Sequence, residues 1–194
     1  MIRGLIRLAV AAGVLAWFVD RRLAHRRGDA PPEPLEMLVV IDARIERTWA
    51  VVADIPRQPE WMHEMKSVRM ETPEPTGVGS RGEATVRIFG ISVTDPVSVT
   101  EFDAPHRFAI RHEGLFSGGG VITLESVANG AATAVRWEET LVPPLLPELG
   151  ALLQAPILRE VFQADLMRLK RLVETGSADG GPAGAGDPGS ANAS

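Results

Sequence analysis

The 194-residue sequence contains neither cysteine nor tyrosine. The absence of cysteine excludes disulfides, thiolate metal sites and cysteine nucleophiles, and the absence of tyrosine removes phenolic acids and bases. Positive charge is scarce as well, because 20 lysines and arginines face 25 acidic residues. The resulting net charge of −5 argues against a general nucleic-acid-binding protein. Hydrophobic residues, at 45%, suffice to build a core and are too numerous for a wholly disordered chain.

The positive charge is concentrated at the N-terminus. Residues 1–28 hold six arginines and one acid, Asp20, so their net charge is +5 and the rest of the chain carries −10. The uncharged run from Leu8 to Val19 is followed by a cluster of arginines. Since a bilayer span needs about 20 apolar residues, this run spans only if the flanking arginines snorkel. An apolar helix that ends in aromatic residues and arginines is nevertheless typical of a membrane anchor, which we expect over residues 1–28.

Two alternatives to an anchor remain open at this point. A cleaved secretory signal is disfavoured, because no small-x-small cleavage site follows directly and the sequence Asp-Arg-Arg at 20–22 resists translocation. An N-terminal helix that packs on the domain is the other alternative. The positive-inside rule places an arginine-rich flank in the cytoplasm, so we expect a membrane-anchored protein whose domain faces the cytoplasm. Whether the anchor spans the bilayer or lies in its interface is left open.

The remainder of the chain divides by composition. Residues 29–34 form a proline-rich polar linker, and residues 35–175 contain the apolar patterning of one domain. Residues 176–194 are mostly small and include no large apolar side chain. Such a segment cannot bury enough surface to offset its chain entropy, so we expect a disordered tail.

Most of the domain shows the alternation of apolar and polar residues that predicts strands. The predicted strands cover residues 36–43, 66–71, 82–89, 91–102, 107–113, 120–127 and 133–141. Turn residues separate them, including the run from Ser117 to Gly120 and the Asn129-Gly130 pair, which is a strong hairpin signal.

Helical spacing predicts three helices in the domain. Two short ones, at 46–54 and 56–62, follow the first strand, and a long C-terminal one at 148–174 is expected to bend or break at Pro156. The order of elements predicts an α+β fold in which a curved antiparallel sheet wraps around the long helix. Because one helix only partly fills the concave face, an apolar cavity should remain.

Three segments of the domain resemble a known family. Residues 41–61 run from Ile-Asp-Ala through a Val/Trp-containing helix to Asp-Ile-Pro and Trp61, and this is similar to the opening of the START-like helix-grip superfamily, also called SRPBCC. The Pro-x-Arg-x-x-x-Arg pattern at 105–111 and the Gly-x-x-x-Leu-Glu pattern at 120–125 resemble later strands of that group. The Thr-x-Val-x-Trp pattern at 133–137 is a further likeness.

The resemblance covers residues 36–174 and is specific for the fold. The superfamily includes polyketide cyclases and dehydrases, coenzyme Q-binding proteins and lipid-transfer domains. It therefore implies a helix-grip fold with a hydrophobic-ligand pocket under the C-terminal helix. It names no ligand, because one fold hosts many functions.

One histidine has an inward direction in the predicted sheet. His112 shares a strand face with Phe108 and Ile110, so it can hydrogen-bond a ligand carbonyl or act as an acid or base. The alternative is a histidine already satisfied near a strand end. Glu139 and Asp165 are the other inward acid–base candidates, and a strand-end salt bridge is the alternative for Glu139.

Metal and cofactor chemistry finds little support in the sequence. The only tight pairs, His63-Glu64 and His112-Glu113, are adjacent residues, which point to opposite faces of a strand and chelate poorly. We therefore expect no metal and no cofactor.

The candidate ligand contacts are residues expected on the concave face, on the facing side of the C-terminal helix, or at the family's tryptophan position. They are Trp61, Phe108, Ile110, His112, Ile122, Leu124, Val135, Trp137, Phe162, Leu166 and Leu169. Each apolar member is alternatively a plain core residue. The apolar, proline-rich segment 141–147 is either a lid or membrane-touching loop beside the cavity mouth or a rigid connection.

Three functions compete. The first is a membrane-tethered module that binds or transfers a small hydrophobic molecule or lipid, because an anchor, a spacer and a cavity coincide. The second is a cyclase or dehydrase-like enzyme, which needs an inward acid or base and is disfavoured by the lack of tyrosine. The third is an interaction module with a filled core and no ligand.

Overall fold

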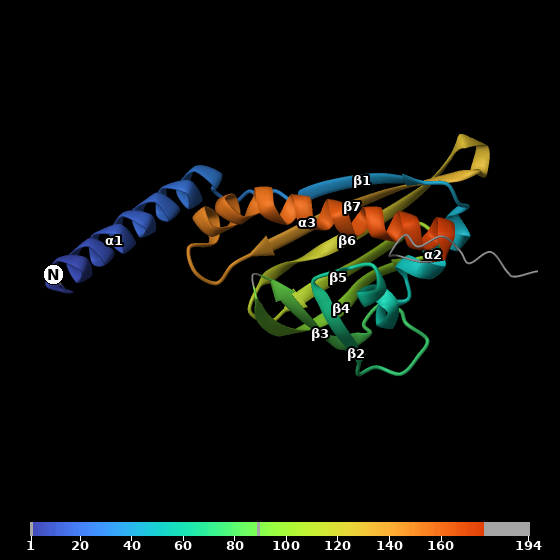
Figure 1. The fold of residues 1–194 in the computed structure, drawn as a ribbon, viewed down its shortest axis with the longest axis horizontal. Coiled ribbons are helices and arrows are strands. Elements are labelled where there is room, and N and C mark those ends of the chain that lie inside the picture. The colour runs from blue at the N-terminus through green and yellow to red at the C-terminus, as the bar shows by residue number, and fades with distance from the viewer. Residues whose placement is uncertain (1, 89, 177–194) are drawn as a thin grey trace, which may run out of the picture.

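The computed structural model describes residues 2–88 and 90–176 (Figure 1). In the expected disordered tail, residues 177–194 lie outside the described residues, as does the last residue of the strand predicted at 82–89. The elements in chain order are α1 (Ile2–Arg27), β1 (Leu35–Ile41), α2 (Ile45–Val52), the 3-10 helix η1 (Ile55–Glu60), β2 (Met65–Met70), β3 (Arg81–Ile88), β4 (Ile91–Asp103), β5 (Arg107–Glu113), β6 (Ser117–Val127), the 3-10 turn η2 (Ala128–Gly130), β7 (Ala132–Val142) and α3 (Pro147–Thr175).

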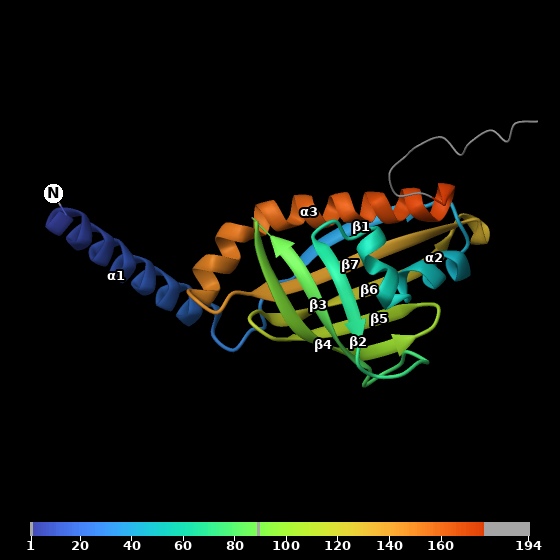
Figure 2. The ribbon, with the colours of Figure 1, turned by 60° about the horizontal axis from the view of Figure 1, so that its bottom comes forward.

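The seven strands form one antiparallel sheet in the order β1-β7-β6-β5-β4-β3-β2. The chain begins the domain at one edge of the sheet, and β7 returns to pair with β1 from Leu35↔Glu139 to Ile41↔Thr133. The sheet curves, and α3 lies across its concave side (Figures 1 and 2). The α+β architecture expected from the strand and helix pattern is therefore confirmed.

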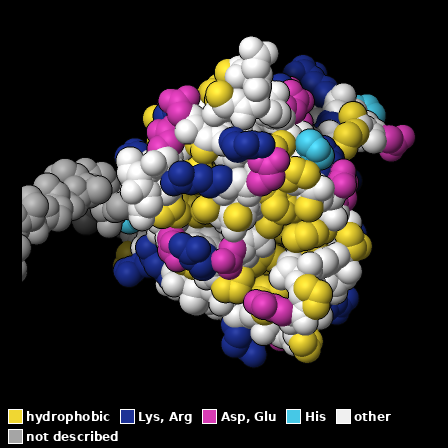
Figure 3. Space-filling model, turned by 90° about the vertical axis from the view of Figure 1, so that its right-hand side faces the viewer, with side chains coloured by type: hydrophobic (Ala, Val, Ile, Leu, Met, Phe, Trp, Pro, Cys, Tyr) yellow, Lys and Arg dark blue, Asp and Glu magenta, His cyan; other side chains and the backbone are white. Residues whose placement is uncertain are grey.

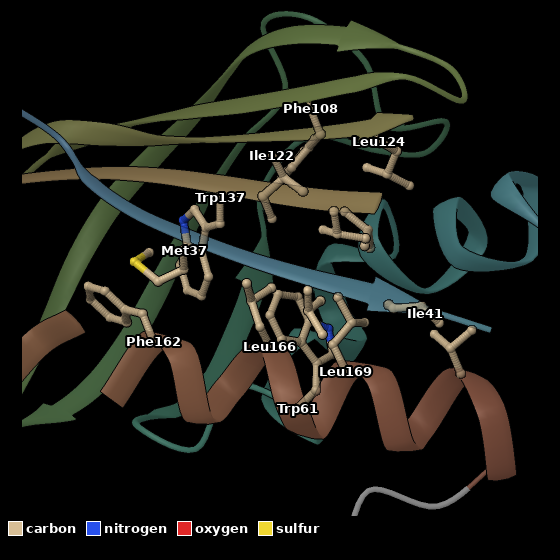
Figure 4. Close-up of a cluster of buried hydrophobic side chains, with 14 of the residues drawn as sticks. Met37, Ile41, Trp61, Phe108, Ile122, Leu124, Trp137, Phe162, Leu166 and Leu169 are labelled. Atoms are coloured by element: carbon tan, nitrogen blue, oxygen red, sulfur yellow. The ribbon is translucent and has the colours of Figure 1, made fainter. Parts of the chain in front are cut away.

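Strand alternation and helix periodicity converge on one apolar core. In β1 every second residue is buried, so Met37 and Ile41 face α3. In α3 the buried residues recur every three or four positions and include Phe162, Leu166 and Leu169. Figure 4 shows these two sets of side chains facing each other between the sheet and the helix. Burial of each such side chain contributes about 1.5–3 kcal/mol, which holds the helix on the sheet.

The glycine run was predicted as a turn, but it lies inside a strand. β6 begins at Ser117, and its glycines pair with β5 on one side and β7 on the other. Gly118 has φ +126°, and a Cβ there would collide with the carbonyl oxygen of Thr140. The absence of side chains thus lets this strand approach its neighbours closely. The sequence predicted a turn because glycine is common in turns, but glycine also occurs where two strands lie unusually close.

Pro156 does not break the C-terminal helix, which runs without interruption from Pro147 to Thr175. Figure 2 shows that the first turns of α3 are nevertheless bent away from the axis of the remainder. A proline removes one helical hydrogen bond and favours a bend. The packing of Leu158 and the residues beyond it on the sheet keeps the helix continuous past this point.

α1 is helical, and it projects from the domain (Figure 1). Among the described residues, none of the helices is long and apolar enough to traverse a bilayer. The membrane anchor expected over residues 1–28 is therefore not supported as a bilayer span, because the charged residues that flank Leu8–Val19 leave too short an apolar run. α1 meets the domain near its C-terminal end, where the Asp20 carboxylate accepts hydrogen bonds from the backbone N–H groups of Glu148 and Leu149 at 2.9 and 2.8 Å.

Candidate ligand cavity

A cavity of about 330 Å³ lies between the concave face of the sheet and α3. Its size falls at the lower end of the range that small-molecule sites occupy, roughly 300–1,000 Å³. Apolar side chains form most of its wall, and they come from β2 to β7, from η1 and from α3. The expectation that one helix leaves part of the concave face uncovered is therefore met.

The structure separates the eleven candidate contacts into two groups. Six line the cavity: Phe108, Ile110, His112, Ile122, Trp137 and Phe162. The other five are buried in the core beside it: Trp61, Leu124, Val135, Leu166 and Leu169. Leu124 shows the reason, because it follows Ile122 on the same strand face but lies farther along the strand, where core side chains already fill the space. Whether the six touch a ligand stays a prediction.

Much of the wall was not among the candidates. It includes Val68, Ala84, Val97 and Val99 from β2, β3 and β4, and Met62 from the segment after η1. The signal that could have found them is the alternation in β4, where Asp95, Val97 and Val99 point inward two residues apart. The cavity wall therefore includes β2, β3 and β4 as well as β5, β6 and β7, which carry most of the candidate residues.

A polar cluster interrupts the apolar wall. The His112 Nε2 atom lies 3.0 Å from Glu139 Oε1, and the indole Nε1–H of Trp137 donates to Glu139 Oε2 at 2.9 Å. Glu139 is 4% exposed, so its carboxylate is held by protein donors rather than by water. The inward direction expected for His112 and Glu139 is confirmed, and they are partners of each other.

Gly120 makes this cluster sterically feasible. β6 runs between β5, which carries His112, and β7, which carries Glu139. Gly120 is paired with Glu139, and a Cβ at this position would lie 2.5 Å from Glu139 Oε2 and 3.3 Å from Trp137 Nε1. The missing side chain therefore opens the space across which the carboxylate reaches the imidazole.

The cluster favours a positively charged imidazole. Burial opposes protonation of His112, but the hydrogen bond to Glu139 and the negative charges of Glu139 and Asp95 outweigh it and raise the pKa of His112 above its ordinary value. Its second ring nitrogen makes no hydrogen bond to any residue that the structure describes. The site thus offers an imidazole that can hydrogen-bond an oxygen atom in the cavity.

Asp165 forms a second polar point in the wall. It lies on α3, is 2% exposed, and accepts hydrogen bonds from the backbone N–H of His63 at 2.9 Å and from Arg168 at 3.1 Å. Burial raises its pKa to about 6, although both hydrogen bonds and the charge of Arg168 act in the opposite direction. No group of three or more His, Asp or Glu side chains suited to a metal occurs within residues 2–88 and 90–176.

The family of the chain follows from a match over residues 35–174 to the model of the family described as polyketide cyclase / dehydrase and lipid transport. The chain belongs to this family. The match extends from β1 to α3 and so covers the cavity and every strand of the sheet. The START-like resemblance noted in the sequence is thereby confirmed. No curated protein sequence matches the chain.

Solved structures share the fold of this polyketide cyclase / dehydrase and lipid transport domain. A Thermus thermophilus protein is 20% identical with a TM-score of 0.60, and the alignment covers 74% of this chain and 99% of that one. A Deinococcus radiodurans protein is 22% identical with a TM-score of 0.56, covering 74% and 98%. The Zhui aromatase/cyclase from a Streptomyces species is 15% identical with a TM-score of 0.54, covering 74% and 96%. At these identities the likeness shows the fold alone.

Proposed function

We propose that this protein binds a small, largely hydrophobic molecule such as a lipid or a polyketide in the cavity under α3. The observation that carries the proposal is an apolar cavity of about 330 Å³ with the His112 imidazole in its wall. An empty cavity of this kind is stabilised when an apolar ligand fills it, because the lining side chains gain contacts that they otherwise lack. The family, which includes lipid transport, supports this assignment.

The position of the polar cluster suggests how a ligand is oriented. Its apolar part lies against side chains such as Phe108 and Phe162, and an oxygen atom of its polar part accepts a hydrogen bond from His112. Molecules with a carbonyl, carboxylate or hydroxyl at one end fit this arrangement. A purely hydrocarbon ligand leaves the imidazole without a hydrogen-bond partner from the ligand.

Mass spectrometry of the purified full-length chain tests the proposal. Native spectra should show a stoichiometric adduct, and organic extraction should release a quinone, lipid or polyketide. Ala84→Phe places a ring into the cavity and should reduce the adduct and the uptake of a fluorescent hydrophobic probe. Leu38→Phe, on the exposed face of β1, is the matched control. A wild-type protein that carries no adduct and takes up no probe would contradict the proposal and favour a ligand-free interaction module.

An enzyme is the second candidate, and the buried His112–Glu139 pair is the observation that favours it. An imidazole whose pKa is raised by a carboxylate can donate a proton to a substrate oxygen, and the neutral ring can then accept a proton from the substrate or from water. His112→Ala separates the two functions. Loss of turnover of a polyketide-like substrate with unchanged affinity would support the enzyme, and loss of affinity alone would support binding.

The finer proposal is that α1 holds the cavity at a membrane surface, with the domain on the cytoplasmic side. Most large apolar side chains of α1 are exposed, among them Leu8, Leu15 and Phe18. The Trp17 and Phe18 rings pack edge to face at 5.0 Å beside the arginine cluster, an arrangement suited to the headgroup region. A lipid-like ligand is concentrated at such a surface, so tethering raises its local concentration near the cavity.

A further inference from the structure

The topology brings the mouth of the cavity and α1 to the same end of the molecule. Antiparallel pairing places five strand ends at the same end of the sheet. They are the end of β3, the start of β4, the end of β5, the start of β6 and the end of β7. α3 begins five residues after β7 ends, and α1 ends shortly before β1 begins at this same end of the sheet. Figure 1 shows α1 extending outward from it.

Exposed apolar side chains gather at this end of the sheet. Outside α1 they are Ile91, Leu115, Leu145, Leu152, Leu153 and Ile157, which we call the mouth rim. Ile91 and Leu115 are 67% and 52% exposed and also line the cavity, so the apolar surface continues from outside to inside. Elsewhere the described exposed large hydrophobics are scattered over a loop, β1 and α3, at Leu38, Val40, Val78 and Met167. At the opposite end of the molecule, Figure 3 shows hydrophobic side chains interspersed with basic and acidic ones.

The rim is held in place by buried polar groups. The Asp95 carboxylate accepts a hydrogen bond from the backbone N–H of Leu115 at 2.8 Å, and Asp95 is 6% exposed. Gln154 donates to the carbonyl of Leu141 at 2.8 Å, which ties the first turns of α3 to the end of β7. These contacts fix the backbone that carries the rim, so its apolar side chains stay exposed to water. Apolar side chains that gather on the surface are typical of an interaction site.

Charge identifies the partner. The exposed arginines Arg7, Arg22 and Arg26 of α1 make no ion pair with any described residue. Arg27 is the exception, because it forms a two-pronged pair with Glu148 at 2.7–3.0 Å that fastens α1 to α3 beside the rim. Basic charge therefore stands at the rim end of a domain, residues 35–175, whose own net charge is −6. An anionic lipid surface attracts this end and repels the rest.

We infer that the mouth rim docks on an anionic lipid bilayer together with α1, so that the cavity opens onto the lipid. The inference rests on the proposed hydrophobic ligand and adds the surface through which it enters. A lipid-like molecule then passes between the bilayer and the cavity along Ile91 and Leu115 without crossing water. A second copy of this chain, whose acidic domain would also cover apolar side chains, is the rival that the experiment excludes.

The cysteine-free sequence makes a clean test available. Single variants of the full chain, Leu115→Cys and Leu145→Cys at the rim, carry an environment-sensitive fluorophore, and Val78→Cys at the far edge is the matched control. Leu15→Cys reports on α1. The proteins are mixed with vesicles of phosphatidylcholine and phosphatidylglycerol, and then with phosphatidylcholine alone. We expect both rim labels to shift to the blue and to be quenched by spin-labelled lipid on the mixed vesicles, and the Val78→Cys label to stay unchanged.

A second set of variants measures the contribution of the rim. The double variant Leu115→Ser with Leu145→Ser should partition onto the mixed vesicles at least tenfold more weakly than wild type, whereas Leu38→Ser with Val78→Ser should partition normally. All four residues are more than half exposed, so the folded structure should survive. Rim labels that do not respond overturn the inference, even if the α1 label does. A concentration-dependent dimer in sedimentation would then assign the face to a second copy.

Probe uptake in water, without vesicles, keeps the two proposals separate. A wild-type protein that takes up a fluorescent hydrophobic probe but does not dock leaves the binding function intact and overturns the rim inference. A protein that takes up no probe refutes the binding function on which the inference rests, whatever the vesicles show.

Discussion

The two halves of the space under α3 differ although the same strands build both. At the end near α2, Trp61, Leu124 and Leu169 are almost fully buried and leave no room. At the mouth end, Ile110, Phe162 and the polar cluster surround a cavity. Strand alternation supplies inward side chains equally to both halves. The difference lies in how closely the helix and the sheet approach, and in whether a large side chain occupies the gap between them.

Truncation in the filled half should produce the largest effect. Trp61→Ala removes a fully buried indole that packs edge to face on Trp137 at 6.0 Å, and it should cost about 3–5 kcal/mol of unfolding free energy. Ile110→Ala, in the cavity wall, should cost much less, because Ile110 is only half-buried and already faces a void. Denaturant titration of both variants measures the contrast, and equal losses would show that the two halves are packed alike.

A more conservative change sharpens the same test. The indole Nε1 of Trp61 has no hydrogen-bond partner among the described residues. Trp61→Phe therefore keeps most of the apolar contact and should recover most of the stability that Trp61→Ala loses.

The second effect concerns the acid in the wall. The pKa of Asp165 rises from 3.8 to about 6 on folding, so the folded protein binds this proton more tightly than the unfolded chain. Stability should therefore fall as pH rises from about 4 to about 6, by about 2–3 kcal/mol. Asp165→Asn still offers an oxygen to His63 and should flatten this part of the profile. Denaturation at several pH values checks it, and an unchanged slope would assign the pH dependence to other groups.

The third effect concerns the space beside Glu139. Gly120→Ala places a methyl group 2.5 Å from Glu139 Oε2, so the carboxylate must shift away from Trp137 and His112. We expect a loss of about 1–3 kcal/mol in thermal or chemical unfolding. Gly77→Ala is the matched control, since its added Cβ meets nothing within 4 Å. Equal stability of the two variants would show that the carboxylate moves without cost.

The smallest expected effect is a change of titration. Because the pKa of His112 is raised on folding, its contribution to stability is complete below pH 6.5 and is lost as pH rises through the folded pKa. Glu139→Gln removes the carboxylate charge, so burial should then lower the pKa of His112. NMR titration of the imidazole measures this directly. A His112 pKa that remains raised would shift the cause to Asp95.

The sequence predicted the strands, the long helix and the direction of His112, because these depend on local periodicity. It failed at Gly118, whose place inside a strand depends on the close approach of β7. It left open whether the N-terminal helix spans a bilayer, and a span is not supported, because no described helix is long and apolar enough to cross one. The part of the wall from β2 to β4 was missed, since small aliphatic residues such as Val97 and Ala84 look the same in a filled core and around a cavity.

By itself, then, the sequence determined which side chains share a face of each strand or helix, and with them the α+β order of strands and helices. Alternation with period two and recurrence every three to four residues are properties of the local backbone, and they need no knowledge of distant segments. The tertiary structure decided where that shared face is filled and where it is hollow. A cavity is the difference between the volume that sheet and helix enclose and the volume of the side chains within it, so Ile122 lines it and Leu124 does not.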